Sequence, residues 1–133
     1  MEKEFVPYEL TVKLKELGFN EPCLGYYAGD ILCTGQPQEM HLDKDGNYKK
    51  TKTESYPIIA APTYSQAFRW FREKHDLVSW ITRRAGFHKE YSWYISNFNN
   101  DDPNEYQFDS HIETYEETEL ACLDKLIEIV ENK

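Results

Sequence analysis

A short cationic segment with aromatic neighbours is the part of this sequence that most clearly combines residue types able to bind a ligand. The candidate ligand-binding residues are Arg83, Arg84, His88 and Trp93, with Trp80, Phe87 and Lys89 close to them in the chain. Guanidinium groups bind phosphate oxygens bidentately and stack on aromatic faces, so this segment could hold a base or a nucleotide phosphate. The alternative is that the arginines pair with acidic residues nearer the C-terminus.

A second group of chemical interest is acidic. Acidic and basic residues balance as far as Phe98, so the whole formal net charge of −9 lies beyond it, where Lys125 and Lys133 are the only Lys or Arg residues. The candidate partner-binding residues are Asp101, Asp102, Glu105, Asp109 and Glu113. They could form a negative surface that docks on a basic partner or imitates phosphates, or they could simply be a solvated face. This charge balance disfavours a general nucleic-acid binder, which needs cations to displace counterions from phosphates.

Motifs for catalysis, metals or cofactors are not found. The sequence lacks Gly-x-Ser-x-Gly, a phosphate-binding glycine loop, His-Glu-x-x-His and Cys-x-x-Cys. A nucleophilic pair of Cys23 or Cys122 with a histidine stays open because such pairs meet in space, although buried, inert thiols are favoured. Cys23, Cys33 and His41 are too widely spaced for a typical structural zinc site. We therefore expect no enzyme, no metal and no cofactor.

Length and composition indicate one domain over residues 1–133, because a chain of this size can bury a substantial core. The 10 Tyr, 7 Phe and 3 Trp can supply much of that core. No apolar run approaches the ~18 residues that a membrane-spanning helix needs. The charged start of the chain and the odd number of cysteines favour a cytoplasmic protein with reduced thiols.

Capping and periodicity signals predict three amphipathic helices. The first covers residues 7–17 and ends at Gly18, the second follows the capping box of Thr63 and Gln66, and the third runs from residue 115 or 116 to 131 behind Thr114. Strands are expected within residues 23–35, 77–83, 90–98 and 105–114, and a hairpin within 40–55 around Asp45 and Gly46. The fold class is therefore α+β: a small, mostly antiparallel sheet with the three helices packed on one face.

Several segments resemble small uncharacterised proteins encoded by bacteriophages and prophages of gut bacteria. The segments that carry the resemblance cover residues 4–19, 21–27, 61–74 and 115–130, which is roughly half of the chain and mainly its three expected helices. No activity is assigned to that group, so the resemblance implies no functional residue.

These observations together favour a non-enzymatic accessory protein of phage or prophage type, which binds a host or defence-system macromolecule through its acidic surface. The protein partner, host or phage, is not identified by the sequence, and neither is the oligomeric state. The alternative from a different class is a small-molecule or nucleotide-binding protein, including a sequestering one, that uses aromatic residues and the turn at residues 83–89.

Overall fold

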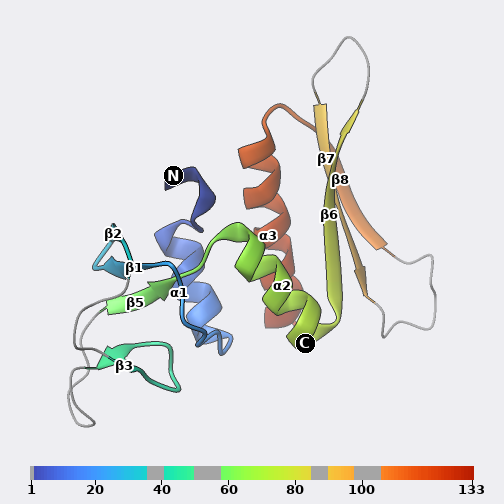
Figure 1. Ribbon diagram of the computed structural model, residues 1–133. Coiled ribbons are helices and arrows are strands. Elements are labelled where there is room, and N and C mark those ends of the chain that lie inside the picture. Colours follow the sequence, from blue (N-terminus) through green and yellow to red (C-terminus); the bar gives the residue numbers. More distant parts are fainter. Residues whose placement is uncertain (1, 36–40, 50–57, 85–89, 98–105) are drawn as a thin grey trace. The chain divides into compact units, whose positions relative to one another are not determined.

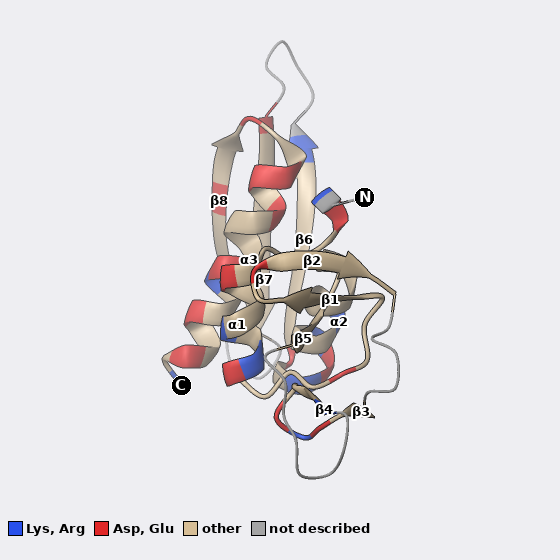
Figure 2. Cartoon of the chain, turned by 90° about the vertical axis from the view of Figure 1, so that its left-hand side faces the viewer, with Lys and Arg blue, Asp and Glu red and all other residues tan. Residues whose placement is uncertain are grey.

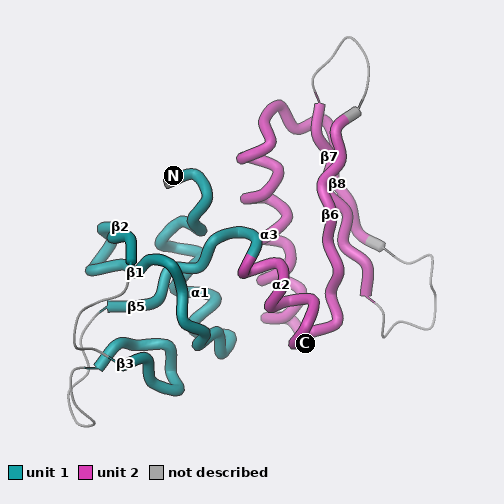
Figure 3. The backbone as a smooth tube through the Cα atoms, in the orientation of Figure 1, with its two compact units in different colours: residues 1–65 teal, residues 66–133 magenta. Residues whose placement is uncertain are grey.

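The computed structural model describes residues 2–35, 41–49, 58–84, 90–97 and 106–133 of the chain (Figure 1). The α+β class is confirmed: within these residues the chain forms three α-helices and three small antiparallel sheets. Two compact units divide the chain, residues 1–65 and residues 66–133 (Figure 3). The strands are thus shared among three sheets, and the expectation of a single domain stays a prediction.

Unit 1 contains a three-stranded sheet and a two-stranded hairpin. The larger sheet has the antiparallel order β2-β1-β5, and β3 pairs with β4 in the hairpin. A buried cluster of Phe5, Tyr27, Ile59 and Ala61 forms its core, with Tyr8, Val12 and Leu32 packed against it. The elements of unit 1 are η1 (Glu2–Glu4), α1 (Tyr8–Glu16), β1 (Gly25–Ala28), β2 (Ile31–Thr34), β3 (His41–Leu42), β4 (Tyr48–Lys49) and β5 (Ile58–Ala61).

The first predicted helix is confirmed together with its C-terminal cap. α1 ends at Glu16 with Leu17 as its C-cap, Gly18 follows with a φ of 103°, and the Phe19 N–H donates to the Leu14 carbonyl at 3.0 Å. This is the Schellman arrangement, in which a left-handed glycine lets the chain reverse and satisfy the last helical carbonyls. Leu14 and Phe19 are both buried, so the cap also adds to the apolar core.

Hydrogen bonds of the Val6 backbone fix the segment that precedes α1. The Val6 carbonyl accepts hydrogen bonds from the Tyr27 hydroxyl at 2.6 Å and from the Thr11 hydroxyl at 3.2 Å. The Val6 N–H donates to the Pro62 carbonyl at 3.0 Å. Val6, Thr11 and Tyr27 are buried, so these bonds spare polar groups the cost of burial without a partner.

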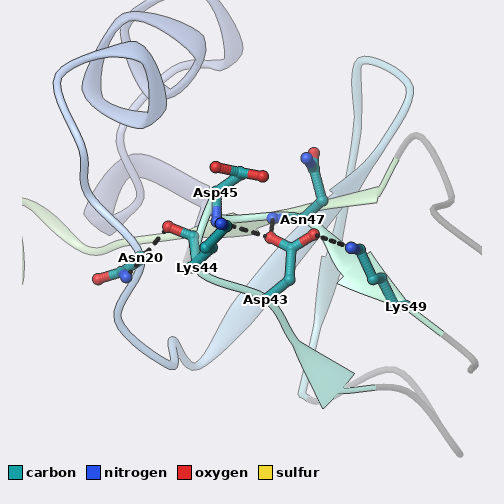
Figure 4. A network of polar contacts seen from close by, with 6 residues as sticks. All are labelled: Asn20, Asp43, Lys44, Asp45, Asn47 and Lys49. Atoms are coloured by element: carbon teal, nitrogen blue, oxygen red, sulfur yellow. Dashed lines mark hydrogen bonds and ion pairs between the residues drawn. The ribbon is translucent and has the colours of Figure 1, made fainter. Parts of the chain in front are cut away.

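A carboxylate organises the predicted hairpin between β3 and β4 (Figure 4). One oxygen of Asp43 accepts the N–H groups of Asp45 and Asn47, each at 2.9 Å, and the other lies 3.3 Å from Lys49 Nζ. Burial raises the pKa of Asp43, but the hydrogen bonds from Asn47, Lys49 and Asp45 outweigh it and hold the pKa below its usual value. The side chain therefore stays ionised and closes the turn.

The form of this turn differs from the two-residue turn that Asp45-Gly46 predicts. Gly46 has a φ of 82°, but Asp45 is not among the described residues with positive φ. Instead, the Gly46 N–H donates to the Asp43 carbonyl at 3.2 Å and the Asp43 N–H to the Asn47 carbonyl at 2.8 Å. This pattern is typical of a three-residue loop with a left-handed glycine, and the contacts of the Asp43 carboxylate explain why it is preferred.

Unit 2 is built around a second three-stranded sheet with the antiparallel order β6-β7-β8. α3 packs on one face of this sheet (Figure 1). The buried side chains of α3 are Thr118, Cys122, Leu123, Leu126 and Ile127, and those of the sheet include Leu77, Trp93 and Ile95. The elements are α2 (Tyr64–His75), which begins at the end of unit 1, β6 (Leu77–Arg84), β7 (Glu90–Asn97), β8 (Tyr106–Ile112) and α3 (Tyr115–Glu131).

The second and third predicted helices and the three long strands are therefore confirmed. α2 passes directly into β6 because Asp76 adopts a φ of 55°, the left-handed conformation that commonly ends a helix. In the part of the chain that the structure describes, none of the helices has the length and apolar character needed to cross a membrane.

Candidate functional site

Acidic residues of β7, of the link between β8 and α3 and of the first turn of α3 lie at the end of unit 2 where α3 begins (Figure 2). We call Glu90, Glu113, Glu116 and Glu117 the acidic end. The pairing of Tyr91 with Ile112 places the start of β7 beside the end of β8, immediately before the turn into α3. Glu90 Oε2 lies 2.8 Å from His111 Nδ1, which shows how closely these segments approach.

The first turn of α3 carries Glu116 and Glu117, and Glu113 lies immediately before its N-cap. The Thr114 hydroxyl accepts the Glu117 N–H at 3.1 Å, and the Thr118 hydroxyl donates to the Thr114 carbonyl at 2.7 Å. The predicted N-cap at Thr114 is thus confirmed, and negative charge at this end is favoured by the helix dipole. The side chains of Glu113, Glu116 and Glu117 are exposed. No ion pair among the described residues involves these three.

One turn further along α3, Glu119 lies in a less polar environment. Burial, with the repulsion of Glu116 second, raises the pKa of Glu119 to about 7. Burial likewise raises the pKa of the Cys122 thiol to about 12, although a hydrogen bond with Ser79 acts in the opposite direction. A thiol with so high a pKa is protonated at neutral pH, which makes Cys122 a poor nucleophile.

Glu119→Gln is expected to stabilise the protein at pH 8 relative to wild type. The folded state holds a proton on Glu119 up to about pH 7, whereas the unfolded chain releases it near pH 4.5. Wild type therefore loses stability as the pH rises from 4.5 to 7. Solvent screens this half-exposed group, which reduces the effect. The free energy of unfolding of Glu119→Gln should therefore exceed that of wild type by about 1 kcal/mol at pH 8. Urea unfolding at pH 5 and pH 8 measures it.

The matched control is Glu131→Gln, because Glu131 is an exposed glutamate on the same helix. The difference between the two pH values should be larger for Glu119→Gln than for Glu131→Gln. Equal effects of Glu119→Gln at pH 5 and pH 8 would contradict a raised pKa at this carboxyl.

The candidate partner-binding residues fall into two groups. Asp101, Asp102 and Glu105 lie outside the described residues. Asp109 is exposed on the edge strand β8, where its Oδ1 accepts the Ser110 N–H at 2.8 Å, and Glu113 belongs to the acidic end. Sequence reasoning missed Glu90, because it belongs to the electrically balanced part of the chain. No local signal could have found it, since the pairing of β7 with β8 brings it to this end.

The candidate ligand-binding residues are spread over different environments. Arg83 is exposed at the end of β6, and none of the ion pairs among the described residues involves it. Arg84 pairs with Glu90 in the strand register, while His88 lies outside the described residues. Trp93 is only 6% exposed and pairs with Ile81, so it lies on the opposite face of the sheet from Trp80. Trp80 and Trp93 therefore do not lie together on one face beside the turn. A ligand site at residues 83–89 stays a prediction.

In the described part of the chain, no cluster of His, Cys, Asp and Glu residues could hold a metal ion. Cys23, Cys33 and Cys122 are free thiols. No protein-family model matches the chain, and no curated protein and no solved structure matches it either.

Proposed function

We propose that this is a non-enzymatic accessory protein of phage or prophage type, which docks through its acidic end on a basic surface of a host or defence-system macromolecule. The observation that carries the proposal is the exposure of Glu116 and Glu117 on the capped first turn of α3, and of Glu113 immediately before the cap, outside the ion pairs among the described residues. Charges on a rigid element can meet a partner without first losing the conformational freedom of a loop.

The electrostatics of Glu119 support the same proposal. Its raised pKa results mainly from burial and, in second place, from repulsion by Glu116, so part of the cost of ionising Glu119 is repulsion from one glutamate of the acidic end. A basic partner would relieve this repulsion and favour the ionised form of Glu119. Binding should then release a proton near neutral pH, and affinity should rise as the pH increases from 6 to 8.

Neutralising three of the four glutamates of the acidic end is expected to weaken docking strongly. In the triple variant Glu113→Gln, Glu116→Gln and Glu117→Gln, the loss of three charge contacts of about 0.5–1 kcal/mol each weakens binding roughly 10- to 100-fold. The measurement is affinity capture from a gut-bacterial lysate at low and moderate salt, followed by titration of the purified captured protein. The affinity of wild type should fall steeply with salt because the contact is electrostatic.

The matched control is a triple variant that changes the net charge by the same amount but outside the acidic end. Glu16, Glu73 and Glu131 are exposed glutamates of α1, α2 and the far end of α3. Their triple replacement by Gln should leave the affinity close to that of wild type. Full affinity of the acidic-end variant for the purified partner would overturn the proposal, and equal losses in both variants would show a dependence on net charge alone.

A further inference from the structure

Two tyrosine rings meet where the first turn of α3 lies on the β6-β7-β8 sheet. Tyr91 belongs to β7, and Tyr115 is the first residue of α3. Their ring centroids are 5.8 Å apart and the ring planes are at 78° to each other, so the two rings stand nearly perpendicular. Tyr115 is 46% exposed and Tyr91 is partly exposed. We call Tyr91 and Tyr115 the tyrosine pair, which presents two aromatic rings at the surface of unit 2.

A carboxyl group lies beside the tyrosine pair. Glu119 follows Tyr115 by four residues in α3, so the two side chains are neighbours on one side of the helix. Burial, followed by the negative charges of Glu119 and Tyr91, raises the pKa of the Tyr115 hydroxyl, so both groups lie close enough to act on it. None of the ion pairs among the described residues involves Glu119. A cation placed here would therefore meet a carboxylate that no cation yet compensates.

The charged groups around this place favour a cation on balance. Glu116 and Glu117 belong to the same turn of α3 as Tyr115 and add negative potential. Arg83 pairs with Tyr91 in the strand register, so it lies on the same face of the sheet and repels an incoming cation. It is exposed and takes no part in the ion pairs of the described residues, so solvent screens this repulsion.

Aromatic rings and a carboxylate together select one kind of cation. A ring face attracts a cation held within about 6 Å of its centroid. A guanidinium suits this combination better than an ammonium, because its plane stacks on a ring while its N–H groups donate to a carboxylate. The chemistry of the tyrosine pair with Glu119 is therefore that of an arginine-binding site.

We propose that the tyrosine pair and Glu119 receive an arginine side chain of the basic partner. This inference rests on the proposed function, in which the partner surface is basic, and it names the side chain that this surface inserts. The guanidinium stacks on a tyrosine ring and donates hydrogen bonds to the Glu119 carboxylate. The glutamates of the acidic end then meet the basic groups around that arginine. Arginines buried near the centre of an interface commonly contribute much of the affinity.

The test uses the full chain and N-acetyl-arginine amide, so it requires no protein partner. Backbone amide chemical shifts measured by NMR at pH 8 and constant ionic strength follow the binding. We expect saturable shifts at residues 115–119 with a dissociation constant on the order of 10 mM, because single cation–π and ion-pair contacts are weak. N-acetyl-citrulline amide has nearly the same shape without the charge, and it should give no saturable shift.

Substitutions locate the binding of the arginine amide. Tyr115→Leu should weaken it roughly two- to fivefold, because an aromatic face is lost while an apolar side chain remains. Tyr115→Phe keeps the ring and should bind as wild type does. Glu119→Gln should weaken the binding by a similar factor, whereas Arg83→Gln should strengthen it because a like charge is removed. Far-ultraviolet circular dichroism checks that each variant is folded.

Phe108→Leu is the matched control. Phe108 is 59% exposed in the row that Trp80, Tyr94 and Phe108 form across the opposite face of the sheet. Its replacement should leave the affinity for the arginine amide unchanged. Equal binding of the arginine and citrulline amides would overturn the inference, and so would full affinity in both Tyr115→Leu and Glu119→Gln. The titration needs no captured protein, so a failure here is distinct from a failure of docking through the acidic end, which the triple glutamine variant decides.

Discussion

Leu126→Ala is expected to lower the free energy of unfolding by roughly 2–5 kcal/mol, the range for truncating a fully buried leucine. Leu126 has no exposed surface and lies on α3, the helix that packs on the β6-β7-β8 sheet. The truncated side chain leaves a cavity whose walls lose contacts that water cannot replace. Urea unfolding followed by circular dichroism measures the change, with the m-value checked for constancy.

The same substitution at Leu120 is the control. Leu120 lies on α3 but is 40% exposed, so Leu120→Ala removes little buried surface and alanine favours the helix. We expect a change within about 0.5 kcal/mol. Similar losses for the two variants would show that α3 does not use the face containing Leu126 for packing.

Gly46→Ala is expected to destabilise the hairpin of unit 1 by about 2 kcal/mol or more. Gly46 has a φ of 82°, and an alanine costs roughly 1–2 kcal/mol in the left-handed conformation. A Cβ at this position would also lie 2.8 Å from the Phe19 carbonyl oxygen and 3.1 Å from Lys15 Cγ. The Phe19 carbonyl belongs to the backbone beside the α1 cap, so it cannot move aside as a flexible side chain can. Urea unfolding measures the loss.

Gly29→Ala separates the two contributions. Gly29 has a φ of 64°, but a Cβ there would meet nothing within 4 Å. It should therefore show the conformational cost alone. The excess loss in Gly46→Ala reports the contact with Phe19. If the two variants lose the same stability, the backbone at Phe19 adapts to the added carbon.

Elements with local signals could be predicted well from the sequence. The Gly18 cap of α1, the Thr114 cap of α3 and the Asp-Gly hairpin each depend on residues within one or two turns of chain. Even so, the type of hairpin turn was not predictable from Asp45-Gly46 alone. The carboxylate of Asp43, which lies outside that dipeptide, binds the N–H groups of Asp45 and Asn47 and selects a longer loop.

The sites were less predictable because they depend on contacts between distant strands. Strand alternation within β6 does not reveal which face α3 will cover, so the sequence alone could not separate the environment of Trp80 from that of Trp93. The register of β6 with β7 pairs Trp80 with Tyr94 and buries Trp93 on the other face. A register shifted by one residue would exchange these roles.

The sequence by itself determined the α+β class, the three helices with their caps, and the concentration of negative charge beyond Phe98. These depend on composition and on interactions between residues that are near neighbours in the sequence. The tertiary structure alone decided that Glu90 joins the glutamates of α3, that Glu119 has a raised pKa, and that Trp80, Tyr94 and Phe108 form one exposed row. Each of these results from strand pairing or burial between segments separated in sequence, and no local pattern encodes it.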